Sequence, residues 1–99
     1  MFRPQLQDAL RDRDAVLRAF LDDEGRLRTI PTKISKRLVI LDLLAQEFEP
    51  GERYDETEVN SRLRAFHPDV AALRRYLVEE RFLDREHGVY WRSGGSVDS

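Results

Sequence analysis

The chain has 99 residues, which fits one small domain with its own hydrophobic core, and it has no cysteine, which excludes disulfides and thiol catalysis. Its 17 basic and 19 acidic residues give a formal net charge of −2, so any attraction to nucleic acid has to come from local clusters of basic residues. No apolar run approaches the roughly 18 residues of a membrane span, and the first residues lack the apolar core of a signal peptide, so we expect a cytoplasmic protein.

The first segment, residues 1–24, is predicted to contain one amphipathic helix over residues 2–22. Its apolar residues recur at steps of three and four, with Arg13 and Asp14 between the two halves. Gly25 suits a position just after a helix end, because glycine tolerates a positive φ. We expect this helix either to cover the back of the main domain or to pair with a second copy of the chain.

The main domain is predicted over residues 25–92. Residues 25–30 alternate polar and apolar side chains, which suits a short strand near the C-terminal hairpin, and Pro31 blocks its continuation. Thr32 or Ser35 is expected to cap the helix that follows.

That helix, residues 34–48, is the most hydrophobic part of the chain. It is apolar most of the way round, which is typical of a helix at the centre of a core. Residues 49–52 are predicted to form a turn, because they contain a Pro-Gly pair. Arg53 and Tyr54 are expected to form a very short strand after it.

The sequence signals of a helix start agree at Asp55. Asp55 and Glu58 stand three residues apart before an apolar run, which is the spacing of a capping box. Tyr54, directly before the cap, is placed to pack on Val59 as a hydrophobic staple. We therefore predict that a helix begins here.

A second helix is predicted over residues 68–81. Pro68 disfavours a helical residue before it, which ends the preceding helix at Phe66 or His67. Either His67 or Asp69 caps the second helix. The linker of about three residues has the length found in a helix-turn-helix.

A tight β-hairpin is predicted after the second helix, with strands over residues 82–86 and 89–92. The two-residue turn ends in Gly88, which favours a type I′ turn because both central residues need a positive φ. Successive side chains of a strand point to opposite faces, so one of Tyr90 and Trp91 is expected in the core.

These elements predict a winged helix-turn-helix with an extra N-terminal helix, in which the hairpin is the wing. This is a mainly α fold with a small β-hairpin, of the α+β class. Residues 93–99 are small, polar and rich in glycine, so we expect them to form a disordered tail.

Basic residues gather before and within the core helix, on the second helix of the turn unit and on the wing. In a winged helix these parts can share one side, which would neutralise DNA phosphates. The candidate nucleic-acid-binding residues are Lys33, Lys36, Arg37, Arg74, Arg75, Arg85 and Arg92. The alternative is a solvated surface with ion pairs inside helices, such as Glu58 with Arg62. Phosphate contact is favoured over base reading, because the first turn of the second helix offers Asp69 and alanines.

No catalytic, cofactor or metal motif stands out. His67 and His87 are the only histidines, and with no cysteine they lack the spacing of a metal site. Asparagine weakens a helix interior, so Asn60 is expected to bind a nearby loop through its side chain.

Several short motifs follow one another along the chain in a recognisable order. They are Lys36-Arg37, Glu58-Val59-Asn60, Leu73-Arg74-Arg75 with Leu77-Val78, Asp84-Arg85-Glu86 and Tyr90-Trp91-Arg92. In this order they resemble the bacterial DUF2087 family, over roughly residues 25–92. Members of that family occur alone or attached to helix-turn-helix regulator domains. The resemblance therefore implies a transcription-associated module of unknown function, and it implies no reaction, cofactor or ligand.

Two functions follow as expectations. The first is a transcription-associated winged-helix protein that binds DNA through a basic face. The second is a non-enzymatic protein-interaction module that binds a regulator, a polymerase or its own copy through the same scaffold. We expect neither an enzyme nor a metal-binding protein, and we expect no membrane partner.

Overall fold

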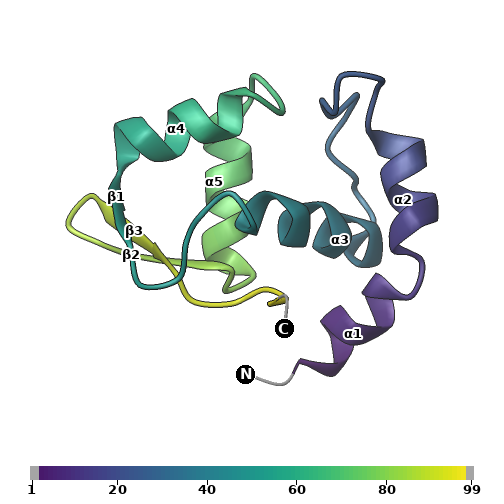
Figure 1. The fold of residues 1–99 in the computed structure, drawn as a ribbon, viewed down its shortest axis with the longest axis horizontal. Coiled ribbons are helices and arrows are strands. Elements are labelled where there is room, and N and C mark those ends of the chain that lie inside the picture. The colour runs from purple at the N-terminus through teal and green to yellow at the C-terminus, as the bar shows by residue number, and fades with distance from the viewer. Residues whose placement is uncertain (1–2, 98–99) are drawn as a thin grey trace.

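The computed structural model describes residues 3–97, and within them it contains five helices and three strands. The helices are α1 (Pro4–Leu10), α2 (Arg13–Phe20), α3 (Ile34–Ala45), α4 (Glu56–Arg64) and α5 (Val70–Glu79), and the strands are β1 (Arg53–Asp55), β2 (Leu83–Glu86) and β3 (Val89–Arg92). Figure 1 shows α3 in the middle, with α1 and α2 on one side and α4, α5 and the sheet on the other. This is the predicted α+β class, and the order from α3 to β3 is compatible with a winged helix-turn-helix.

Helix α3 is the centre of the core, as its apolar sequence predicted. The side chains from Leu38 to Leu41 are all buried, as are Leu44 and Ala45 one turn later. The helix ends at Ala45, three residues before the predicted end, and residues 46–48 continue as tighter i→i+3 turns that bury Phe48 completely.

The start of α3 differs from the prediction, because neither Thr32 nor Ser35 caps it. Lys33 occupies the N-cap position and makes no side-chain cap. Instead, Nη1 of Arg37 donates hydrogen bonds to the carbonyls of Pro31 and Thr32, at 3.3 and 3.0 Å. A long side chain one turn into the helix therefore holds the preceding loop.

The predicted single helix over residues 2–22 was wrong, because the chain forms two helices, α1 and α2. A continuous helix would place Arg13 in line with Ala9 and Leu17, on the face that packs on α3. The chain turns at residues 11–12 through i→i+3 hydrogen bonds, which leaves Arg13 exposed while Ala9 and Val16 are both buried. Phe2, which the prediction included, lies outside the described residues.

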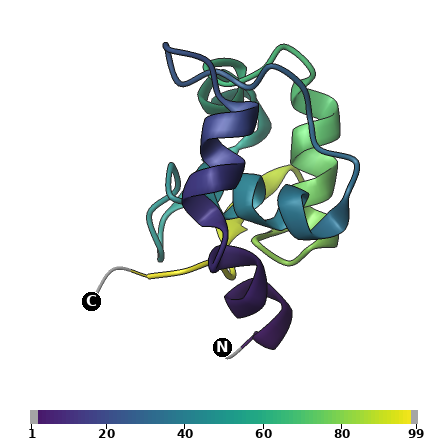
Figure 2. The same cartoon turned by 90° about the vertical axis from the view of Figure 1, so that its right-hand side faces the viewer.

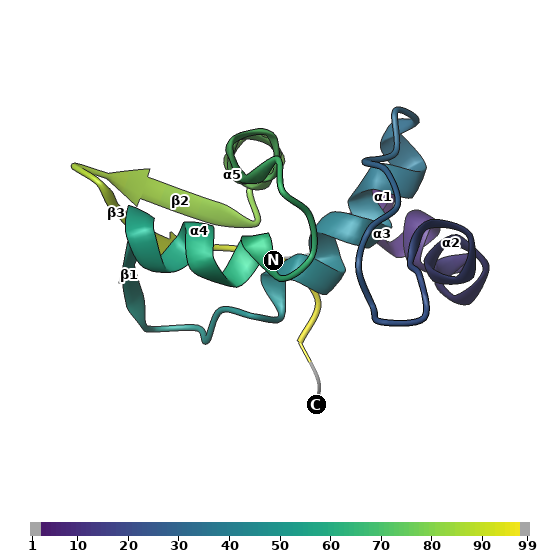
Figure 3. The ribbon, with the colours of Figure 1, turned by 90° about the horizontal axis from the view of Figure 1, so that it is seen from above.

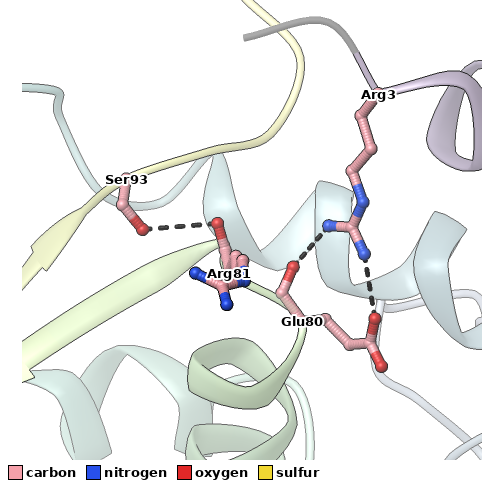
Figure 4. A network of polar contacts seen from close by, with 4 residues as sticks. All are labelled: Arg3, Glu80, Arg81 and Ser93. Atoms are coloured by element: carbon pink, nitrogen blue, oxygen red, sulfur yellow. Dashed lines mark hydrogen bonds and ion pairs between the residues drawn. The ribbon is translucent and has the colours of Figure 1, made fainter.

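Both N-terminal helices cover α3, which is the first of the two roles expected for this segment. Figure 2 shows α1 and α2 in front of α3. Arg3, just before α1, reaches the end of α5, where Nη2 lies 2.9 Å from Oε1 of Glu80 and Nη1 donates to the carbonyl of Glu80 (Figure 4). The N-terminal segment is thus joined to α5 as well as to α3.

Residues 25–30 were expected to pair near the hairpin, but they lie against the end of α2 instead. Leu27 forms a single antiparallel bridge with Leu21, and its N–H donates to the carbonyl of Phe66 at 2.8 Å. The carboxylate of Asp22 accepts the N–H groups of Glu24 and Arg26, both at 2.9 Å. These local hydrogen bonds close a turn beside α2.

Both α4 and α5 begin at an aspartate side-chain cap. Asp55 accepts the N–H of Glu58 at 2.8 Å, as predicted. Of the two candidate caps for the second helix, Asp69 is correct, because its carboxylate accepts the N–H of Ala72 at 3.1 Å. Nδ1 of His67 accepts the N–H of Asp69, so the histidine supports the cap from outside.

The three strands form one antiparallel sheet in the order β1-β3-β2. The turn between β2 and β3 has positive φ at His87 (52°) and Gly88 (76°), which is the predicted type I′ geometry. Tyr90 is paired with Tyr54 on one side and Arg85 on the other, and only 1% of it is exposed. The core residue of the β3 pair is therefore Tyr90, while Trp91 is half-buried under the Arg53 guanidinium.

Residues 93–96 are bound to α3, which differs from the predicted disordered tail. The buried carboxylate of Asp42 accepts two hydrogen bonds of 2.6 Å from Ser96, one from its N–H and one from its hydroxyl. Ser93 donates to the carbonyl of Arg81 (Figure 4). Val97 is exposed, and residues 98–99 lie outside the part described.

Candidate nucleic-acid interface

Three of the seven candidate residues lie around one surface hollow between α5 and β2. Arg74, Arg75 and Arg85 line it together with Ala71, Val78 and Glu79, and its volume is about 390 Å³. We call this surface the arginine face. Figure 3 shows α5 end-on beside the hairpin that carries β2, so a helix and the strand that follows it in the chain form one surface. The residues that line the hollow carry three cations and one carboxylate.

Arg75 is the most available cation of the arginine face. Leu73 and Leu77 turn inward from α5, which places Arg75 on the outer side of the helix. Its side chain is 60% exposed, and its ion pair with Glu79, one turn later, is long at 3.8 Å. An exposed pair of this kind contributes little, so Arg75 can exchange it for another anion.

Arg85 is the second available cation. It shares a face of the sheet with Leu83 and its partner Tyr90, but it lies nearer the hairpin turn and is exposed there. A side-chain hydrogen bond with Tyr90 raises the pKa of Arg85, and the nearby carboxylate of Glu56 adds to the effect. The guanidinium is therefore protonated at any pH at which the protein would meet DNA.

Arg74 is held by neighbouring side chains instead. Nη1 donates to Oδ1 of Asn60 on α4, and Nε lies 3.6 Å from Oε1 of Glu56. The same Glu56 oxygen accepts the hydroxyl of Tyr90 at 2.9 Å. Arg74 thus belongs to a network that joins α4, α5 and β3, and Asn60 binds a helix rather than the loop expected for it.

Arg37 adjoins the arginine face through one aromatic ring. Its guanidinium lies 4.4 Å from the ring centroid of Tyr76, and that of Arg75 lies 5.1 Å from the same centroid. Such stacking holds a guanidinium plane while leaving its edge free to donate hydrogen bonds. The start of α3 and the outer side of α5 therefore meet at Tyr76.

The other three candidates lie elsewhere. Lys33 and Lys36 line a separate groove beside α1 and α2. The guanidinium of Arg92 donates to the carbonyls of Phe48, Gly94 and Ser96, so it fastens the C-terminal segment and is not free for a ligand. The seven residues therefore do not share a single surface.

Two further arginines, Arg26 and Arg62, donate hydrogen bonds to backbone carbonyls and so stabilise the fold. Arg26 donates to the carbonyls at the end of α4, at 2.8 Å from that of Ala65, and Arg62 donates to the carbonyl of Glu47 at 2.7 Å. The predicted pair between Glu58 and Arg62 is present at 3.7 Å.

Sequence reasoning missed the residues that orient the arginine face, which are Tyr76, Glu56 and the hydroxyl of Tyr90. Tyr76 is half-buried beneath two guanidinium groups. The register that sets Arg85 opposite Tyr90 follows from the hairpin turn and was available from the sequence.

The described part of the chain contains neither a metal-binding cluster nor a membrane-spanning helix. Over residues 3–97, no group of three or more histidine, aspartate or glutamate side chains is placed to hold a metal ion. No helix in the same range is both long and apolar enough to span a lipid bilayer.

Comparison with known proteins supports the resemblance seen in the motifs. The family model described as an uncharacterized protein conserved in bacteria (DUF2087) matches residues 26–92. Neither curated proteins nor solved structures gave a match. The match spans more than half of the sequence, from the loop before α3 to the last residue of β3. The chain therefore belongs to the DUF2087 family of bacterial proteins.

Proposed function

We propose that this chain is a transcription-associated winged-helix protein that binds duplex DNA through phosphate contacts made by the arginine face. In this reading α4 and α5 are the helix-turn-helix and the β2–β3 hairpin is the wing. The observation that carries the proposal is the meeting of Arg75 on α5 with Arg85 on β2 around one hollow. A helix and a wing that present cations to the same side suit the rim of a DNA groove.

The proposal assigns phosphate contact and not base reading. Arg74 is occupied by Asn60 and Glu56, and the first turn of α5 presents Asp69 and Ala71. Guanidinium groups bind phosphate oxygens through paired N–H donors, which suits Arg75 and Arg85 in their exposed positions. The net charge of −2 opposes binding at long range, so we expect weak binding that is strongest at low salt.

A salt series tests the proposal with a mixed-sequence duplex and fluorescence anisotropy. Each phosphate neutralised should contribute roughly −0.9 to the slope of log K against log salt concentration. The Arg75→Ala/Arg85→Ala variant should therefore reduce the size of that slope by about 1.8, which is two phosphates at about 0.9 each. Both side chains are exposed, and circular dichroism should show that the variant is folded.

The matched control is Arg11→Ala/Arg18→Ala, which removes the same charge from exposed positions in the N-terminal segment. It should leave the slope close to that of the wild type. Equal losses in both variants would reduce the effect to net charge and contradict a specific face. Absence of any salt-sensitive binding in the wild type would also contradict the proposal and favour a protein-interaction module.

A further inference from the structure

The groove beside the N-terminal helices is independent of the arginine face. It has a volume of about 530 Å³ and lies between α1–α2 and the start of α3. Val16 and Leu38 are buried at its base. Ile34 lines the groove, and 46% of its surface is exposed. Within residues 3–97, Val97 is the only other exposed large apolar residue. An apolar residue in this position is available to a partner.

The wall formed by α2 allows close approach. Ala15 and Ala19 both line the groove, both are exposed, and they stand one helical turn apart. Small side chains at this spacing leave the backbone of α2 accessible, so another helix can pack against it without a bulky side chain between them.

The charges of the groove are separated by sign. Asp8 and Asp12 lie on the side of α1, whereas Lys33 and Lys36 lie at the start of α3. Among the described residues no ion pair joins the two sides: Asp8 contacts Arg11 at 3.7 Å, and Lys36 lies over the ring of Phe20. The groove therefore offers an anionic wall and a cationic wall that do not neutralise each other.

A surface with both signs on opposite walls is complementary to itself. In a two-fold interface, residue i of one copy contacts residue j of the other, and j contacts i in return. Turning a second copy by a half-turn over the groove brings its acidic wall to the basic wall of the first, and the reverse. A partner of one sign would leave one wall unsatisfied, which favours a second copy over a purely acidic or basic ligand.

We propose that a second copy of this chain docks in this groove about a two-fold axis. Asp8 and Asp12 of each copy face Lys33 and Lys36 of the other, and Ile34 is buried between them. The interface leaves both arginine faces free, and it does not depend on DNA binding.

The first test is the mass of the protein without DNA, measured by light scattering over a concentration series. The wild type should have the mass of two chains, and Ile34→Asp should have the mass of one. The matched control is Val97→Asp, which puts the same charge on the other exposed apolar side chain and should remain a dimer. A monomeric wild type, or a dimeric Ile34→Asp, would overturn the proposal.

The second test uses charge reversal at both walls. Asp8→Lys/Asp12→Lys and Lys33→Glu/Lys36→Glu should each be monomeric, because each places like charges opposite one another at both ends of the interface. An equimolar mixture should recover the dimer, because every contact then joins opposite charges. Two variants that fail to associate when mixed would contradict this pairing of walls. All four side chains are exposed, so circular dichroism should confirm that each variant is folded.

Discussion

Replacing Arg74 by alanine should destabilise the fold, whereas replacing its neighbour Arg75 should not. The two residues are adjacent in α5 and both line the arginine face, but their surroundings differ. The Arg74 side chain is 21% exposed and donates to Asn60 on α4. The Arg75 side chain is 60% exposed, and its ion pair with Glu79 and its stacking on Tyr76 both lie within α5.

The magnitude follows from these contacts. A hydrogen bond from a charged donor contributes about 1.5–3 kcal/mol, and loss of Arg74 also leaves the Asn60 carbonyl without this partner. The ion pair with Glu56 adds little, because that carboxylate is 50% exposed. We therefore expect Arg74→Ala to cost about 2–3 kcal/mol, and Arg75→Ala to stay within about 0.5 kcal/mol of the wild type.

Urea denaturation followed by circular dichroism measures both values. In thermal unfolding, a loss of 1 kcal/mol lowers the Tm of a domain of this size by about 4–8 °C, so Arg74→Ala should melt roughly 8–24 °C lower. The Asn60→Ala/Arg74→Ala double variant should lose less than the sum of the single losses, because one contact is removed twice. Equal stability of Arg74→Ala and Arg75→Ala would refute the assignment of Arg74 to the fold.

Three other predictions concern the fold. Gly94→Ala should destabilise it by more than about 1 kcal/mol, because the added Cβ would collide with the backbone carbonyl of Arg81, and a chemical melt that matches the wild type would contradict this. Ser96→Ala should cost about 1 kcal/mol in the same assay, since it removes a hydroxyl donor from the buried carboxylate of α3, and unchanged stability would contradict that role. Hydrogen bonds from the backbone N–H groups of Arg26 and Glu24 hold the pKa of Asp22 below its usual 3.8. The stabilisation from these bonds is therefore present above pH 3.8 and is lost as the pH falls through the lower pKa of the folded state. An NMR titration of Asp22 that gives a pKa of 3.8 or more would be inconsistent with these bonds.

Local signals in the sequence predicted the start of α4 and the β2–β3 hairpin well. The cap at Asp55 and the turn at Gly88 depend on residues within three positions of each other, so their chemistry is visible in a short window. The core helix was also evident, because apolar residues lie on nearly all sides of it after its first turn, which is typical of a helix buried in a core.

Contacts between distant residues could not be predicted in the same way. Whether Arg74 points to solvent or to Asn60 depends on how α4 packs on α5, and the order of residues in either helix does not determine it. The same holds for the C-terminal segment, where Ser96 binds Asp42 across more than fifty residues. The small, polar composition of that segment is equally typical of disorder.

The basic residues around the start of α3 lie on two different surfaces for a related reason. Lys36 and Arg37 are adjacent in α3, and neighbours in a helix point about 100° apart. One therefore faces the groove beside α2, and the other faces Tyr76 of α5. Sequence proximity indicated a shared surface that helical geometry does not permit.

The most direct test of the arginine face is a map of backbone amide shifts while a short mixed-sequence duplex is added at low salt. We expect the shifts to be concentrated in Val70–Glu79 and across the β2–β3 hairpin, while the amide signals of α1 and α2 stay unchanged. Shifts centred on α1 and α2, or none at saturating duplex, would contradict a role for Arg75 and Arg85 in holding DNA.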